Sequence, residues 1–256
     1  MTNISGKENE YEFVKYLNGK KISELNPMFR GFIDKLFPNE TKNSTIKCWK
    51  NHYKEKADIF IKINGSMKGI SIKKGIKNSV HVERISDFIH FLIENKVDRE
   101  VVLEYLKYQY ADGSTNGKGN KRISAEEYKK ENQHNIDKIN HAFRNEKLLK
   151  SATTRFITKG KNSNYYISAI IYGEVNDFVW ATREEIEKIM LSKKDIYSSA
   201  VHFGAMTCQP KNRCLNYNPL YEKDRYCVQI KWYNIFDDII EYMNKTVDKE
   251  FRKQEV

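Results

Sequence analysis

The stretch ADIFIKINGSMKGISIKKG, residues 57–75, contains two short runs in which apolar residues alternate with polar ones. A period of two is typical of β-strands, because successive side chains point to opposite faces of a sheet. Asn64 and Gly65 separate the two runs, and Asn-Gly between alternating segments is a strong signal for a hairpin. The sequence therefore predicts adjacent antiparallel strands at residues 58–63 and 68–73.

Helix and strand patterns alternate through the rest of the chain. Apolar residues at helical spacing predict helices in the segments 6–25 (with a stop at LNGK, 17–20), 26–38, 85–97, 98–111, 182–192 and 234–247. A polar helix pair is predicted at 124–152 and begins with a Ser124–Glu127 capping box. Strands are predicted at 165–173, 200–210 and 225–233, and a polar loop at 39–56.

The helix expected at 85–97 has the clearest amphipathic pattern. Ser86 or Asp87 is expected to cap its N-terminus. Its predicted buried residues are Phe88, Ile89, Leu92 and Ile93.

These elements predict an α/β fold, with a central mixed β-sheet flanked by helices. Strands and helices are mixed throughout the chain, which favours one domain over residues 1–256. Residues 98–155 are expected to form a helical insertion in that domain, and residues 248–256 a frayed tail.

The composition points to a polyanionic partner. Lys and Arg number 45 against 34 Asp and Glu, a formal net charge of +11, which gives affinity for phosphate backbones. A lysine-rich chain without such a partner is the alternative. The N-terminus has no signal-peptide pattern and the apolar runs are too short to cross a bilayer, so we expect a cytoplasmic protein without membrane contact.

The four cysteines favour reduced thiols over a disulfide framework, because they are few and irregularly spaced. Cys208, Cys214 and Cys227 lie in one region, just after His202. Their spacing matches no zinc pattern, so a zinc site is an open alternative to free thiols.

Charged residues gather on one face of the predicted hairpin. Ser71 and Lys73 share a strand face, and Asp58 at the start of the preceding strand can lie beside them. Glu83 follows ten residues after Lys73 and could return to the same place. Two carboxylates suit Mg²⁺, which keeps water and phosphate oxygens as its other ligands, and the ammonium group could stabilise developing charge. Solvated charges on an exposed hairpin are the alternative reading.

These residues resemble the signature of the restriction-endonuclease-like, or PD-(D/E)xK, nucleases. In that family an acidic residue on one strand is followed by an acidic-x-Lys triplet on the next. Asp58 corresponds to the first acid, and Ser71-Ile72-Lys73 to the triplet, with Ser in place of the second acid. One variant, found in restriction enzymes that cut CCGG-type sites, combines Ser-x-Lys with a displaced Glu, and Glu83 corresponds to it.

The resemblance covers roughly residues 5–95 and departs from the family in two ways. Ala57 stands where many members have Pro, and the gap from Asp58 to Lys73 is shorter than in the CCGG-cutting enzymes, so their base specificity is not carried over. The family often has a metal-proximal Glu in an N-terminal helix. Glu10 corresponds to it here; the competing positions are Glu8 and Glu12.

The resemblance implies a nuclease centre. Asp58 and Glu83, helped by Glu10, would bind Mg²⁺ (with Mn²⁺ as a substitute), Lys73 would activate water, and Ser71 would mark the vacated acidic position. His81 lies on the same strand face as Glu83 and is a second candidate for a base or phosphate ligand, or a structural histidine.

Two polar segments are candidates for DNA contact. The Gly- and Lys-rich segment 112–122 is expected to be a mobile loop that grips phosphates. The segment 208–219 is rich in amide and basic side chains of the kind that read base edges, or is an ordinary hairpin loop. The candidate residues are Lys118, Lys121, Arg122, Gln209, Lys211, Asn212 and Arg213.

The expected function is Mg²⁺-dependent hydrolysis of double-stranded DNA, as in a Type II restriction endonuclease. Cutting both strands at a symmetric site would require a homodimer. A structure-selective or repair nuclease with the same centre and a non-catalytic nucleic-acid-binding protein with a decayed site are the alternatives.

Overall fold

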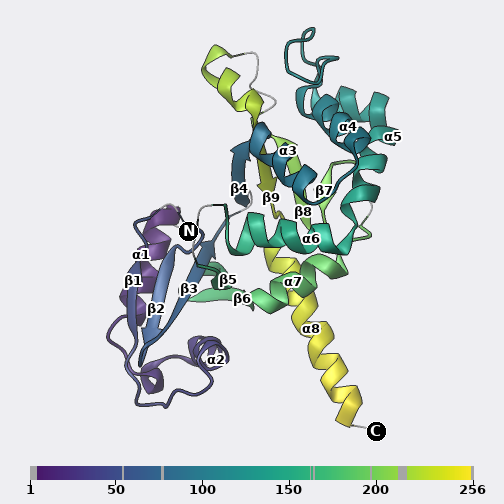
Figure 1. Cartoon of the computed structure of the whole chain (residues 1–256). Coiled ribbons are helices and arrows are strands. Elements are labelled where there is room, and N and C mark those ends of the chain that lie inside the picture. The colour runs from purple at the N-terminus through teal and green to yellow at the C-terminus, as the bar shows by residue number, and fades with distance from the viewer. Residues whose placement is uncertain are drawn as a thin grey trace. The chain divides into compact units, whose positions relative to one another are not determined.

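The chain divides into two compact units in a computed structural model that describes residues 5–53, 55–75, 78–161, 163, 165–196, 198–212 and 218–254. Unit 1 comprises Met1–Asn78, Ile157–Ile189 and Asn234–Val256, and unit 2 comprises Ser79–Phe156 and Met190–Tyr233. Each unit contains its own sheet (Figure 1). No helix among the described residues is long and apolar enough to cross a membrane.

Unit 1 is built on a five-stranded mixed sheet. The order is β1-β2-β3-β5-β6, and only the β3–β5 pair is parallel among these neighbours. The strands are β1 (Lys47–Lys50), β2 (Ile59–Ile63), β3 (Ser66–Lys73), β5 (Ile167–Glu174) and β6 (Asp177–Thr182). The predicted hairpin is confirmed, since β2 and β3 pair antiparallel across Asn64-Gly65.

Helices cover one face of this sheet. They are α1 (Gly6–Leu17), η1 (Ile22–Glu24) and α2 (Pro27–Leu36). Two further helices, α7 (Arg183–Ser192) and α8 (Ile235–Gln254), follow later in the chain. α8 packs against β6, and the ring centroid of its Phe236 lies 6.3 Å from that of Tyr172 on the other face of the sheet. Ser5 and Glu8 form a capping box at α1, and the Asn26 side chain caps α2. The core cluster that joins α1 and α2 to the sheet includes Phe13, Leu17, Phe29, Phe32, Ile33, Ile59, Ile61, Ile63, Ile70 and Ile72.

The opposite face of the hairpin differs in character. Ile59, Ile61 and Ile63 are fully buried against α1 and α2, so by alternation Lys62 and Asp58 point away from these two helices. Trp49 faces the same way from β1 and remains 38 % exposed, with its ring centroid 5.9 Å from that of its cross-strand partner Phe60.

Unit 2 has a four-stranded antiparallel sheet in the order β4-β9-β8-β7. Its strands are β4 (Ser79–Arg84), β7 (His202–Phe203), β8 (Met206–Pro210) and β9 (Cys227–Lys231). Its helical segments are α3 (Ile85–Glu94), α4 (Arg99–Tyr110), α5 (Ala125–Phe143), α6 (Glu146–Thr153) and η4 (Pro219–Tyr226), and the π-helical turn η2 (Thr154–Thr158) begins in this unit. An aromatic cluster fills its core: Phe88, Tyr105, Phe143, Phe156 and Phe203.

Most predicted elements are confirmed, and the differences have local causes. Residues 47–50, expected in a polar loop, form edge strand β1, because pairing with β2 overrides their weak pattern. Strand β6 was missed, and the strand expected at 200–210 is the two-strand hairpin β7–β8. Residues expected as a frayed tail continue α8 to Gln254.

Two details of α3 were predicted wrongly. Its N-cap is Arg84, which makes no side-chain capping bond, since the helix begins one residue before Ser86. Ile93 is 59 % exposed, and Phe91 is buried in its place. Unit 2 joins the helices of residues 98–155 to four strands, and the bounds of the expected insertion stay a prediction.

Candidate active site

Three donors converge on one carboxylate oxygen at the end of the β2–β3 hairpin. Oδ2 of Asp58 accepts hydrogen bonds from Ser71 Oγ at 3.0 Å, from the Ile72 amide at 2.6 Å and from Lys73 Nζ at 3.1 Å. The side chains of Asp58 and Lys73 are each 23 % exposed, so the pair is open to solvent on one side. The structure thus brings together Asp58, Ser71 and Lys73, as the sequence predicted.

The strand register produces this arrangement. Ile59 pairs with Ile70, which places Asp58 next to Ser71 on the face opposite the core. The Asp58 amide donates to the Ile70 carbonyl at 2.8 Å, and the Asp58 carbonyl accepts from the Asn51 amide at 2.9 Å. The backbone of Asp58 is therefore held on both sides by neighbouring strands, and the carboxylate is oriented before any ligand binds.

The second oxygen of Asp58 is left for another partner. Oδ1 accepts no hydrogen bond from any residue in the described part of the chain. A carboxylate oxygen with no protein partner suits a hard cation such as Mg²⁺, which takes one or two protein carboxylates and completes its shell with water and phosphate oxygens. No group of three or more His, Cys, Asp or Glu among the described residues could hold a metal ion by itself.

Ser71 contributes no charge to this cluster. Its side chain is 4 % exposed and its hydroxyl donates to Asp58. The position aligned with the second acid of the nuclease signature is therefore a positioning group for Asp58, and any second metal-binding carboxylate must come from elsewhere in the protein.

Glu10 on α1 is engaged by a lysine. Its Oε2 lies 2.6 Å from Nζ of Lys50, which also sits over the ring of Tyr11. Lys50 pairs with Ile59 and, by strand alternation, shares the core-facing side of the sheet. The structure thus places Glu10 against the edge strand from the helical side.

Glu83 belongs to unit 2, whereas Asp58 belongs to unit 1. It lies on β4 and its side chain is 5 % exposed. Arg155 binds it with two nitrogens, Nη2 at 2.7 Å from Oε2 and Nε at 3.2 Å, and His81 Nε2 lies 3.3 Å from the same oxygen. Burial alone would raise the pKa of Glu83, but the bonds from His81 and Arg155 outweigh it and lower that pKa.

Arg155 was not identified from the sequence. It lies 72 residues beyond Glu83, in the π-helical turn after α6, and no local motif marks it. His81 and Glu83 share one strand face as predicted, and the ring of His81 also packs on Phe156 at 5.3 Å between centroids.

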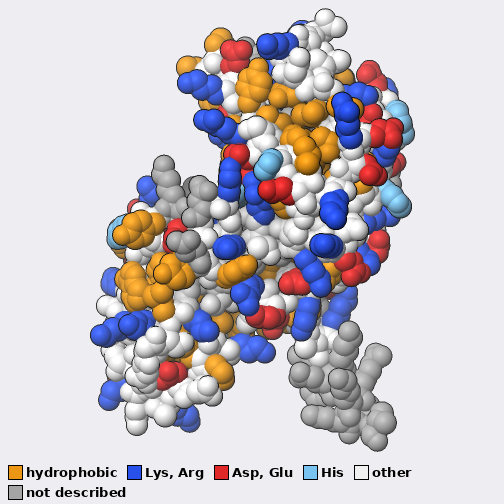
Figure 2. Space-filling model, in the orientation of Figure 1, with side chains coloured by type: hydrophobic (Ala, Val, Ile, Leu, Met, Phe, Trp, Pro, Cys, Tyr) orange, Lys and Arg blue, Asp and Glu red, His pale blue; other side chains and the backbone are white. Residues whose placement is uncertain are grey.

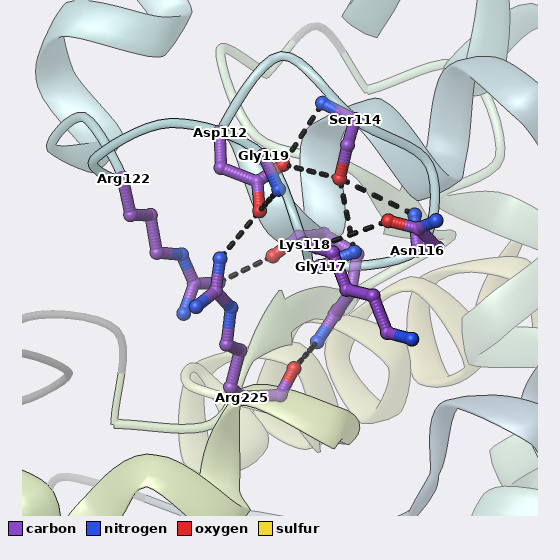
Figure 3. Close-up of polar contacts among 9 residues, drawn as sticks. Asp112, Ser114, Asn116, Gly117, Lys118, Gly119, Arg122 and Arg225 are labelled. Atoms are coloured by element: carbon purple, nitrogen blue, oxygen red, sulfur yellow. Dashed lines mark hydrogen bonds and ion pairs between the residues drawn. The ribbon is translucent and has the colours of Figure 1, made fainter.

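The segment 112–122 is a structured loop in unit 2 (Figure 3). The buried Asp112 carboxylate accepts from the Ser114 amide and hydroxyl and from the Gly119 amide at 3.2 Å, and it forms an ion pair with Arg225. Burial by itself would raise the pKa of Asp112, and these donors lower it on balance. The expected mobile loop is therefore anchored at its base.

Close packing explains the glycines of this loop. A Cβ at Gly119 would lie 2.1 Å from the Asp112 carbonyl oxygen, so only glycine fits there. Lys118 and Lys121 are exposed on the loop, whereas Arg122 is 6 % exposed and donates to the carbonyl of Gln109. Arg122 is therefore part of the interior of unit 2, whereas the two lysines are exposed to solvent.

Replacing Asp112 with alanine should loosen the loop and destabilise unit 2. The change leaves Arg225 and the amides of Ser114 and Gly119 without their acceptor, which we expect to cost about 2–4 kcal/mol of unfolding free energy. Urea denaturation and amide hydrogen exchange over residues 113–121 measure both effects. Asp137→Ala, on the exposed face of α5, should change stability by less than about 0.5 kcal/mol. Equal effects of the two changes would contradict this account.

In the segment 208–219, two of the candidate DNA-contacting side chains bond to another residue of the protein. Lys211 Nζ lies 2.8 Å from Asp224 Oδ1, and Asn212 Nδ2 donates to Asp224 Oδ2 at 2.7 Å. The hydrogen bond with Asp224 raises the pKa of Lys211. Gln209 lies on β8 opposite Gln229, and Arg213 is outside the described residues.

The cysteines of this region show no zinc arrangement among the described residues. Cys208 is fully buried, with its Sγ 3.1 Å from the Tyr105 hydroxyl. Burial raises the pKa of the Cys208 and Cys227 thiols, and both are free cysteines in the structure. Cys214 lies outside the described residues.

Comparison with known proteins identifies the fold. No protein-family model and no curated protein matches the chain. Among solved structures, the restriction endonuclease MspI, crystallised in complex with its cognate DNA, is similar with a TM-score of 0.60 over 88 % of this chain and 88 % of that chain, at 12 % sequence identity. The predicted α/β architecture, a mixed sheet flanked by helices in a restriction-endonuclease-like fold, is confirmed.

Proposed function

We propose that this protein is a Mg²⁺-dependent endonuclease that hydrolyses DNA phosphodiester bonds, and that it acts as a Type II restriction endonuclease. The observation that carries the proposal is the convergence of Ser71, the Ile72 amide and Lys73 on Asp58. This cluster occupies the hairpin of a fold shared with a DNA-cutting enzyme. The net charge of +11 supports a polyanionic substrate.

The residues of the cluster have separate roles in this mechanism. Asp58 would hold the metal through Oδ1, and a bound Mg²⁺ supplies a Lewis acid and lowers the pKa of a coordinated water. Ser71 and the Ile72 amide keep the carboxylate oriented through Oδ2. Lys73, 3.1 Å from the same oxygen, neutralises charge that develops on the phosphate and orients the attacking water.

A second carboxylate would complete the metal site, and Glu83 is our proposal for it. Glu10 is the alternative. Each is in an ion pair, with Arg155 and Lys50 respectively, so metal binding by either would require sharing or exchange of that partner. The variants Glu83→Gln and Glu10→Gln distinguish the two candidates. Replacement of the residue that binds the metal should raise the Mg²⁺ concentration at half-maximal cleavage rate at least about tenfold.

We also propose that residues of unit 2 contact the DNA. Lys118 and Lys121, on the loop anchored by Asp112, would contact phosphates, and Gln209 with the segment that follows it would read base edges. Cleavage of both strands at a symmetric site would use a homodimer, because two scissile bonds then face two identical centres.

Incubation of the purified protein with long phage DNA and Mg²⁺ tests the proposal. Discrete fragments that disappear when EDTA is added are the expected result. Preferential cutting of branched or single-stranded DNA would indicate a structure-selective or repair nuclease with the same centre. DNA binding without cleavage in Mg²⁺ or Mn²⁺ would contradict the enzyme assignment and favour a binding protein, a reading that the uncharged Ser71 supports.

A further inference from the structure

A polar pocket lies at the turn end of the β2–β3 hairpin, away from Asp58. Its volume is about 480 Å³, ample for a phosphate group and several waters. The lining residues are Thr41, Asn43, Ser44, Thr45, Lys47, Lys62, Asn64 and Gly65. Hydroxyl, amide and ammonium groups therefore surround it, and no carboxylate is among the lining residues.

Two lysines face each other in this pocket. Lys47 on β1 and Lys62 on β2 are direct cross-strand partners, and both are exposed. Neither makes an ion pair with any described residue. Like charges directly opposite each other destabilise a strand pair. A bound anion would relieve the repulsion between Lys47 and Lys62.

Protection of a sheet edge explains only one of the two lysines. Lys47 lies on edge strand β1, where a charge discourages pairing with another chain. Lys62 lies on β2, which is paired on both sides, so it has no such role. A shared ligand accounts for both.

The walls of the pocket are held by the hairpin turn. Asn64 has φ +44° and Gly65 φ +94°, which directs the Asn64 side chain toward the segment before β1. Its Nδ2 donates to Glu40 Oε2 at 2.6 Å and to Ser44 Oγ at 3.1 Å, and Ser44 Oγ donates to the same Glu40 oxygen at 3.0 Å. The nearby acidic oxygen is thus occupied by neutral donors, and the lysines remain available.

The pocket and the candidate active site share one face of the sheet. Asp58 and Lys62 are four residues apart on the same side of β2, a separation of about 13 Å at 3.3 Å per residue. Phe60 and Trp49 lie between them. In Figure 2, the region over β1 and β2 shows hydrophobic side chains bordered by lysine or arginine side chains.

We propose that the Lys47–Lys62 pocket binds a phosphodiester of the DNA backbone near the bond to be cut. The proposal rests on the proposed nuclease function and adds a substrate contact to it. A distance of about 13 Å equals the axial rise of about four nucleotides, so a backbone that follows β2 reaches from Asp58 to the pocket within that length. The pocket holds the DNA in register and takes no part in the chemistry.

The salt dependence of DNA binding tests this assignment. In the double variant Lys47→Ala/Lys62→Ala, we expect affinity for a 30-base-pair duplex in Ca²⁺ to fall at least about tenfold at 0.1 M salt. The slope of log K against log salt should decrease by about 0.9, since one phosphate contact is lost. The matched control Lys130→Ala/Lys147→Ala removes the same charge from exposed positions on α5 and α6. Its slope should change by less than about 0.5.

The position of the contact can be checked separately. Ethylation of the backbone phosphate about four nucleotides from the cleaved bond should weaken binding of the wild-type protein and have no further effect on the double variant. An unchanged salt slope in the double variant, with wild-type cleavage intact, would overturn this inference and leave the nuclease proposal standing. If the wild type binds DNA without cutting it, and the salt slope is reduced in the double variant, the phosphate contact at the pocket is supported and the nuclease proposal is overturned. Absence of wild-type DNA binding would overturn both.

Discussion

Lys73→Ala should reduce Mg²⁺-dependent DNA cleavage at saturating substrate by about 10²–10³-fold. Lys73 is the only ammonium group bonded to Asp58 among the described residues, and removing one preformed charge-stabilising group from a phosphoryl-transfer site has an effect of that size. DNA affinity should change much less, because the loss falls on the transition state. Single-turnover cleavage rates and binding in Ca²⁺ measure the two quantities.

Lys74→Ala is the matched control for this change. Lys74 is the next residue in the chain, but its Nζ pairs with Glu174 at 2.8 Å and not with Asp58. Its removal should lower the cleavage rate by less than about threefold, because exposed ion pairs contribute little. Similar losses in both variants would indicate a general charge effect, and retained cleavage in Lys73→Ala would remove this residue from the mechanism.

Arg155→Ala should destabilise unit 2 by about 3–5 kcal/mol of unfolding free energy. The Glu83 side chain is 5 % exposed and the Arg155 side chain 16 %, so truncating the guanidinium leaves a buried carboxylate without its main partner. Urea denaturation followed by circular dichroism measures the loss. The comparison variant is Arg183→Ala, whose pair with Glu184 is exposed and should contribute less than about 1 kcal/mol.

The same ion pair gives a pH dependence with a defined sign. The folded-state pKa of Glu83 is lowered, so its contribution to stability is present above the unfolded value of about 4.5 and is lost as pH falls through the folded value. Below about pH 4.5 the stability difference between wild type and Glu83→Gln should therefore shrink. An unchanged unfolding free energy for Arg155→Ala would contradict the structural role of this guanidinium group.

The arrangement of Asp58, Ser71 and Lys73 in unit 1 could be predicted from the sequence because the signals that determine it are local. Asn64-Gly65 determined the turn, and alternation from that turn placed Asp58 beside Ser71 and Lys73. The same logic found His81 and Glu83 on one face of β4. Within such a hairpin, register follows from the turn and from which residues must be buried.

The partners of buried charges could not be predicted in this way. Glu83 meets Arg155 across 72 residues, and Asp112 meets Arg225 across 113, so each pair depends on the tertiary fold of unit 2. Strand β1 was missed for a related reason, since its lysines obscure a strand that forms by pairing with β2. Local propensity is a weak guide where long-range pairing determines the structure.

The most direct test of the central claim is the Mg²⁺-dependent cleavage rate of Asp58→Asn at saturating DNA. Asparagine preserves the shape of the side chain and can still accept from the Ile72 amide, but it removes the charge that a metal requires. The account predicts a loss of at least about 10²-fold, with folding and DNA affinity retained. Cleavage within a few-fold of wild type would show that the metal-dependent centre, if there is one, is not at Asp58.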